Sequence, residues 1–320
     1  MKAFGFVMLL HPALLPAPAL AQDVWPTRSV RLVVPSSPGG GSDIYARLLA
    51  QGLTEALKQQ FVVDNRPGAS GNIGAEIAAK AAPDGYTFLA PSAPVLIINP
   101  SLYKNLPYNV ERDFIPVARG VISPVVFVSH PSVPVRKFAD LVALGKREPG
   151  KLPYGSAGAG GISNLVVKMI EEASGAAFLH VPYKGLGQAA QGLLRGDTAF
   201  MASGIVVMLP HIRSGKARAL AVTHRAPQLP GTPTLAEAGY ANIEANSTFS
   251  VAAPAGTPAA IVQRLSAEIV KVMKVPAFRE KLDAQALIPV FDTPDEFAVG
   301  LKRERARWAD IIRRNNIVAE

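Results

Sequence analysis

Residues 30–43 read VRLVVPSSPGGGSD, and this stretch decides the fold class. An apolar, β-branched run ends at Pro35, three glycines follow, and apolar residues then recur at helical spacing from Ile44 to Leu53. The order predicts a strand, a glycine turn and the start of a helix. The first turn of a helix has N–H groups without intrahelical acceptors, and the helix dipole favours an anion beside them. The segment therefore predicts a carboxylate or phosphate site, with a plain turn and nothing bound as the alternative.

A second segment of the same kind lies in the other half of the chain. Residues 153–161 read PYGSAGAGG and lead into another apolar helical pattern. Strand and helix patterns alternate along most of the chain, which indicates an α/β architecture. Two glycine-rich strand-to-helix turns, one in each half, predict a cleft with an anion-binding edge on each side.

The remaining pattern fills in this α/β scheme. The dipeptide Thr257-Pro258 predicts an N-cap followed by proline at the first helical position. Residues 293–296 predict a capping box, in which Glu296 reaches back to the Thr293 amide. Apolar runs predict further strands at 61–63, 86–89, 125–128, 178–181, 198–201, 217–223 and 247–252, and helices at 73–81, 138–144 and 205–214.

The first 21 residues predict a cleaved secretion signal. Lys2 gives a positive start, residues 4–10 are apolar, and Ala19-Leu20-Ala21 is a small-x-small cleavage site, so the mature chain is expected to begin at Gln22. We therefore expect a periplasmic protein. The chain has no cysteine, which rules out disulfides and thiolate metal sites. Its net charge of +9 favours anionic ligands, while export argues against nucleic acid as a partner.

The sequence offers little support for catalysis. None of the five histidines has a second ligand at metal-binding spacing, so no metal is expected. The nucleophile pattern G-x-S-x-G is absent at Ser42 and at Ser156. The stretch from Gly158 is close to a dinucleotide fingerprint, but Ser163 replaces its last glycine, so no cofactor is expected. These features favour binding over turnover, and we expect the protein not to be an enzyme.

Taken together, the motifs resemble the substrate-binding receptors of the tripartite tricarboxylate transporter family, often called Bug-type receptors. The resemblance covers essentially the whole mature chain in order. It is carried by residues 34–43, 65–74, 82–87, 98–103, 181–185, 209–212, 220–223 and 253–258. It implies a two-lobed, type II periplasmic binding protein-like α/β fold with the ligand between the lobes. Lobe 1 would comprise residues 22–124 and 248–320, and lobe 2 residues 125–247, with the two crossing strands as the hinge.

In that family, main-chain amides, hydroxyls and ordered water of two strand–turn–helix units grip carboxylate groups. The matching units here are 38–43 and 156–164. Ser42 alone is equally compatible with a plain N-cap, and Asp43 with a residue that complements the helix dipole. The expected ligand-binding residues are Gly39, Gly40, Gly41, Ser42, Asp43, Ser92, Ser156, Ala157, Gly158, Gly160, Gly161, Ser163, Asn164, Lys184 and Ser203.

Departures from the family pattern bear on the ligand. The second loop has Ala159, Gly161 and Ile162 where the family usually has polar side chains, and Ala199 replaces an aspartate. This predicts a cleft suited to a less polar or aromatic carboxylate. The expected function is a monomeric receptor that binds a small organic acid anion and delivers it to a membrane transporter or a sensor. The alternative is an exported hydrolase of a carboxylate or phosphate ester, in which Ser156 would meet His180.

Overall fold

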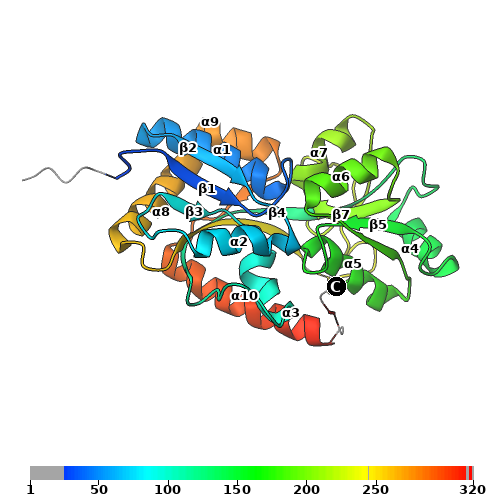
Figure 1. Cartoon of the computed structure of the whole chain (residues 1–320). Helices are drawn as coiled ribbons and strands as arrows, with labels where there is room; N and C mark the ends of the chain where they lie inside the picture. Colours follow the sequence, from blue (N-terminus) through cyan, green and yellow to red (C-terminus); the bar gives the residue numbers. More distant parts are fainter. Residues whose placement is uncertain (1–24, 244, 315–316, 319–320) are drawn as a thin grey trace, which may run out of the picture.

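A computed structural model describes residues 25–243, 245–314 and 317–318 of the chain. The predicted secretion signal, residues 1–21, lies outside the described residues. The described chain forms two α/β lobes side by side, joined by long strands (Figure 1). The strand order through both lobes is β2-β1-β3-β9-β4-β7-β5-β6. This arrangement confirms the predicted two-lobed fold.

The first lobe is built on the strand that opened the sequence argument. β1 (Val30–Val34) pairs in parallel with β2 (Phe61–Asn65) on one side and with β3 (Thr87–Leu89) on the other. Four of its five side chains are fully buried, as expected for a central strand covered by helices on both faces. The helices of this lobe are α1 (Gly41–Leu57), α2 (Asn72–Ala79), α3 (Asn99–Leu102), α8 (Ala259–Lys274), α9 (Pro276–Ala284) and α10 (Pro294–Arg314).

The second lobe repeats the plan on a smaller scale. β5 (Pro153–Ser156) pairs in parallel with β6 (Leu179–Pro182) and with β7 (Phe200–Gly204). β8 (Arg218–Val222) pairs with the far end of the crossing strand β4. The helices that cover this sheet are α4 (Phe138–Arg147), α5 (Ile162–Ser174), α6 (Leu186–Arg195) and α7 (Ile205–Arg213).

Two antiparallel strands, β4 (Phe114–Ser129) and β9 (Asn246–Pro254), run from one lobe to the other and are called the hinge ribbon below. The sequence predicted only residues 125–128 of β4, because Pro116, Gly120 and Pro124 interrupt its apolar pattern. The strand accommodates the interruption near Gly120 through an irregular register, with Gly120 at φ +76°. The strand is therefore four times longer than the predicted one.

The helix starts differ from the predictions in two places. The N-cap of α1 is Gly40, so Ser42 lies inside the first turn and is not a cap. The N-cap of α8 is Pro258, and Thr257 instead donates its hydroxyl proton to the Pro254 carbonyl at 2.7 Å. The capping box of α10 is confirmed, with Thr293 N to Glu296 Oε2 at 2.8 Å and Glu296 N to Thr293 Oγ1 at 3.2 Å.

Two searches confined to the described residues gave negative results. None of their helices is long and apolar enough to cross a membrane. No group of three or more histidine, aspartate or glutamate side chains among them could hold a metal ion. The exact lobe boundaries, 22–124 with 248–320 and 125–247, stay a prediction.

Candidate functional site

A cavity of about 40 Å³ lies between the two lobes, with the hinge ribbon as its back wall. Its size shows that the lobes are closed on one another. The lining residues from the first lobe are Pro35, Ser36, Gly41, Ser42, Ser70, Gly71, Ser92, Ala93 and Pro94. Those from the ribbon are Ser247 and Phe249, and those from the second lobe are Ala157, Gly161, Ile162, Ser163, Lys184, Gly185 and Leu186.

Three helix N-termini meet at this cavity. The first residues of α1, α5 and α6 all line it, so the helices come from both lobes. Their N-cap residues are Gly40, Gly161 and Gly185, and none of the three makes a side-chain cap hydrogen bond. The N–H groups of an uncapped first turn are the donors that an anion accepts from, and the three dipoles add in the same sense.

Glycine is required in the first loop for packing as well as for ligand approach. Gly39 has φ +77°, a backbone conformation that favours glycine. A Cβ on Gly41 would overlap the ring of Phe249, and one on Gly40 would overlap the hydroxyl of Ser36. The loop therefore lies flat against the ribbon and leaves its amide groups at the cavity edge.

Hydroxyl groups supply the other polar atoms of the lining, from Ser36, Ser42, Ser70, Ser92, Ser163 and Ser247. Ser163 Oγ accepts from the Ala157 amide at 3.1 Å, which fixes the second loop against the start of α5. Ser70 Oγ accepts from the Tyr103 hydroxyl at 2.9 Å. Lys184, which is exposed, is the cationic side chain among the described lining residues.

Asp43 faces away from the cavity. Its Oδ2 accepts the Gly39 N–H at 2.9 Å, its Oδ1 accepts from Asn65 Nδ2 at 2.9 Å, and Arg47 Nη2 lies 2.9 Å from Oδ1. The carboxylate is 3% exposed, so it is neutralised and hydrogen-bonded within its own lobe. Asp43 thus shapes the first glycine loop from behind and does not line the cavity.

Ser156 and His180 do meet, at the foot of the second loop. Ser156 Oγ lies 2.6 Å from His180 Nε2 and accepts the Gly158 N–H at 3.0 Å. Ser156 is fully buried and lies outside the cavity lining. Its hydroxyl therefore ties the strand end, the loop and β6 together.

Of the predicted site residues, Gly41, Ser42, Ser92, Ala157, Gly161, Ser163 and Lys184 line the cavity. Gly39, Gly40, Asp43, Ser156, Gly158, Gly160, Asn164 and Ser203 do not. Asn164 accepts from the Tyr154 hydroxyl at 2.5 Å and donates to the Ala159 carbonyl at 2.9 Å, so its amide is used inside the second lobe. Ser203 is buried and donates to the Gly204 carbonyl at 2.9 Å.

Several glycines of the second lobe serve the contact between the lobes instead. A Cβ on Gly158 would lie 2.7 Å from Ser70 Oγ. One on Gly185 would lie 2.6 Å from Ser37 Oγ, and one on Gly187 would overlap the Pro38 carbonyl oxygen. Backbone of one lobe thus lies directly on loops of the other, which only glycine permits at this spacing.

Comparison with known proteins identifies the architecture. Residues 45–317 match the sequence profile described as "Tripartite tricarboxylate transporter family receptor". The chain belongs to this receptor family. Protein BugT of Bordetella pertussis is 37% identical to the receptor over 301 residues, which is 93% of this chain and 92% of BugT. The receptor is therefore a solute-binding protein, and this finding argues against the hydrolase alternative.

Solved structures agree. R. palustris Rpa4515, solved with adipate, has a TM-score of 0.88 and 34% identity to the receptor, with 92% of this chain and 99% of that chain covered. MatC from Rhodopseudomonas palustris, solved with bound malate, has a TM-score of 0.85 and 28% identity, with 90% of this chain and 100% of that chain covered.

Sequence reasoning missed lining residues of three kinds. Leu186 and Gly185 start a third helix, α6, whose glycine N-cap was not recognised because a lone glycine gives a weak signal. Ser70 and Gly71 lie in the loop after β2, within a segment that the family resemblance had already marked. Pro35, Ser36, Ala93, Pro94, Ile162, Ser247 and Phe249 reach the cavity only through tertiary contacts.

Proposed function

We propose that the receptor binds a small organic carboxylate between its lobes, in the periplasm, and presents it to a membrane transporter or a sensor. The observation that carries the proposal is the meeting of three uncapped helix N-termini, from two lobes, at one cavity. A carboxylate has several lone pairs and accepts from several N–H groups at once. The adipate and malate bound by two relatives belong to the same ligand class.

The grip on the carboxylate is assigned to main-chain donors. The amides of Ser42 and Ser163 and their hydroxyls lie on opposite lobes and face one cavity. The amide of Leu186 adds a third direction, and Lys184 adds positive charge at the edge. Binding by both halves stabilises the closed arrangement, because a ligand shifts a conformational equilibrium by its differential affinity for the two states.

The rest of the lining favours an acid with an apolar body. Ala93, Pro94, Ile162, Leu186 and Phe249 present hydrocarbon to the cavity. Burying additional carboxylates against these side chains without partners would cost free energy. We therefore propose that the receptor prefers mono- or dicarboxylates with an apolar segment over a densely charged acid such as citrate.

Isothermal titration of the mature protein tests this preference, with hexanoate, benzoate, adipate, malate and citrate as ligands. We expect micromolar binding, about 8 kcal/mol, for at least one of the first three. Native mass spectrometry of freshly purified protein would identify an acid that co-purifies. Tighter binding of citrate than of every less polar acid would refute the preference, and the absence of binding to any carboxylate would refute the function.

The same proposal includes three coarser features. The receptor carries out no turnover, acts as a monomer, and is exported by cleavage after Ala21. Cell fractionation and the N-terminal sequence of the purified protein test the export. Sedimentation of the mature protein tests the monomeric state.

A further inference from the structure

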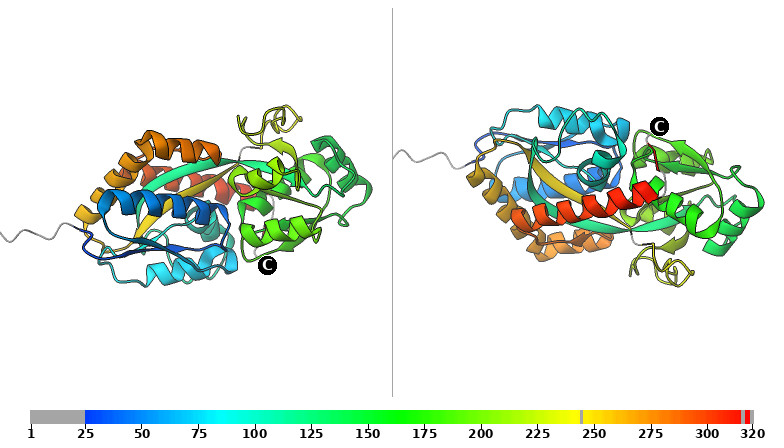
Figure 2. Two further views of the ribbon diagram at one scale, coloured as in Figure 1. Left: turned by 90° about the horizontal axis from the view of Figure 1, so that it is seen from above. Right: turned by 90° about the horizontal axis from the view of Figure 1, so that it is seen from below.

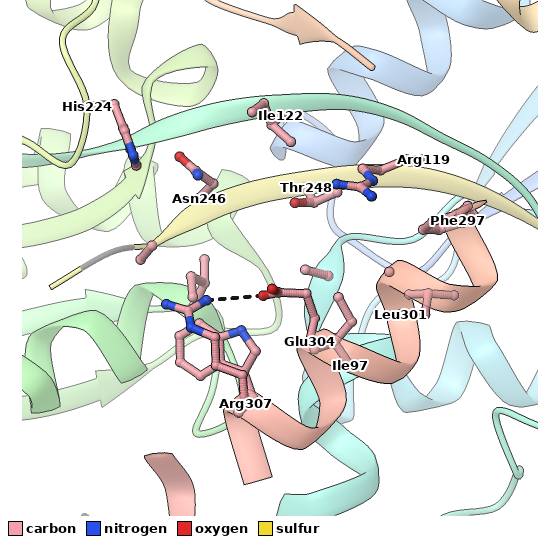
Figure 3. A pocket seen from close by; sticks show the side chains of 15 residues that line it. Ile97, Arg119, Ile122, His224, Asn246, Thr248, Phe297, Leu301, Glu304 and Arg307 are labelled. Atoms are coloured by element: carbon pink, nitrogen blue, oxygen red, sulfur yellow. Dashed lines mark hydrogen bonds and ion pairs between the residues drawn. The ribbon is translucent and has the colours of Figure 1, made fainter. Parts of the chain in front are cut away.

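A second cavity, of about 240 Å³, lies on the other face of the hinge ribbon (Figure 3). In β9, Ser247 and Phe249 face the cleft, while Asn246 and Thr248 line this second cavity. Successive side chains of a strand point to opposite faces, so the two cavities lie back to back across one strand. Ile122, which pairs with Thr248, lines the second cavity from β4.

Both lobes contribute to its walls. α10 passes below the ribbon and ends beside the second lobe, which closes the cavity from beneath (Figure 2). Leu301 and Trp308 come from α10, whereas His224 comes from the second lobe. Ala93 and Ile162, one from each lobe, line both this cavity and the cleft. Any change in the separation of the lobes therefore alters both cavities.

The lining combines an apolar floor with two guanidinium groups. Arg119 passes over α10 at Gly300, where a Cβ would lie 2.8 Å from Arg119 Nη2, and the same nitrogen lies 2.6 Å from Asp292 Oδ2. The glycine thus leaves space for the guanidinium at the cavity wall.

The second guanidinium comes from α10 itself. Arg307 Nη1 lies 3.1 Å from Glu304 Oε2, and Arg307 Cζ lies 5.3 Å from the centre of the Trp308 ring. A guanidinium has five N–H donors, so one ion pair leaves others for a further acceptor. Arg119, Arg307 and Glu304 are the charged residues among the described lining, and together they carry one net positive charge.

We propose that this cavity is a second binding site, for a small amphipathic anion whose carboxylate faces Arg307 and Arg119 and whose hydrocarbon body lies on Leu301 and Trp308. The volume equals that of about eight waters at about 30 Å³ each, enough for a chain of six carbons. The assignment of this site does not depend on the ligand of the cleft.

Occupancy of the second site is coupled to the cleft. The two cavities lie on opposite faces of the ribbon about which the lobes move, so a rotation that opens the cleft narrows the second cavity. An anion seated there resists opening and tightens binding in the cleft, and by linkage a cleft ligand tightens binding in the second site. This coupling, unlike the site itself, rests on the function proposed above.

Trp308 provides a direct readout of the second site. The sequence has two tryptophans, and a Trp25→Phe variant leaves the emission of Trp308 alone. The probe is 6-bromohexanoate, whose bromine quenches a tryptophan that it touches, and hexanoate is the competitor. We expect saturable quenching that hexanoate reverses. Arg307→Gln should weaken it at least tenfold, while Arg303→Gln, an exposed arginine on the same helix, should leave it unchanged.

A variant in the cleft separates the two sites. Lys184→Gln should leave the quenching of Trp308 intact. Quenching that rises linearly without saturation, that is equal in the Arg307→Gln and Arg303→Gln variants, or that disappears with Lys184→Gln would overturn the second site. Saturable quenching in a protein that binds no acid in its cleft would overturn the proposed function and leave this site standing.

The coupling has its own measurement. With 6-bromohexanoate present, the Kd of adipate for the cleft should fall several-fold in the Arg303→Gln variant and stay unchanged in the Arg307→Gln variant. An equal rise of the Kd in both variants would mean that the probe competes inside the cleft, which would overturn the coupling.

Discussion

Ser156 Oγ lies 2.6 Å from His180 Nε2, and the same hydroxyl accepts the Gly158 amide proton. In isolation this pair resembles a nucleophile and its base. However, the hydroxyl is fully buried and lies outside the cavity lining, so it holds the second loop in place. The contact is therefore read as a brace for the binding loop.

The brace predicts an effect on binding without an effect on turnover. Ser156→Ala removes the acceptor of the Gly158 amide and should weaken carboxylate binding by about tenfold, about 1.4 kcal/mol. Calorimetry measures the affinity, and an ester panel measures turnover. Ser101→Ala, on an exposed hydroxyl, is the matched control. Ester hydrolysis by the native protein that Ser156→Ala abolishes would reverse this interpretation.

Gly187 tests the closure of the lobes. Its missing Cβ would overlap the Pro38 carbonyl of the other lobe, so Gly187→Ala should hold the lobes apart. We expect a larger radius of gyration by X-ray scattering in the presence of ligand and a Kd raised at least tenfold. Gln188→Ala, at the exposed neighbouring position, should change neither. A Gly187→Ala protein that closes normally would show that the two lobes do not pack this closely in solution.

Asp43→Ala distinguishes two opposite effects. Loss of the carboxylate removes the acceptor of the Gly39 amide and leaves Asn65 and Arg47 without it, which should cost about 1–3 kcal/mol in unfolding free energy. Loss of a negative charge near the cleft would by itself favour an anion. Because the charge is already paired, we expect weaker carboxylate binding. Glu55→Ala on the same helix is the control, and tighter binding in Asp43→Ala would show that repulsion dominates.

The pH dependence of stability is expected from an N-terminal cap in the second lobe. Backbone N–H groups of Arg136 and Lys137 hold the pKa of Asp140 below its ordinary value of 3.8. A lowered folded-state pKa means that this stabilisation is present above the ordinary value and is lost as the pH falls through the folded one. The Tm difference between native protein and Asp140→Asn should therefore be largest at neutral pH and shrink below about pH 4. A difference that stays constant down to pH 3 would contradict the assignment.

Local patterns accounted for most of the fold. The buried run from Val30 to Val34 and the capping box at Thr293 depend on neighbours in sequence, and both are confirmed. β4 was predicted too short, because the register irregularity that absorbs Gly120 depends on its pairing with β9. Fold class thus follows from periodicity, whereas strand length here follows from tertiary pairing.

The site divides in the same way. Gly41 and Ser163 reach the cavity because a glycine turn before a helix has a local signature. By contrast, the contact of Gly158 with Ser70 joins two lobes, and no spacing in the sequence indicates it. The alternation of residues 246–249 between two cavities was equally invisible, since both faces of that strand carry polar residues.

The glycine N-caps of α1, α5 and α6 mean that each helix begins without a side chain to complete its first turn. An acid bound among them becomes the shared cap of three helices that belong to different halves of the chain. Recognition is thereby invested in the negative group, while the hydrocarbon walls remain free to diverge. A receptor built in this manner can acquire a new nutrient by repainting its walls, without rebuilding the grip.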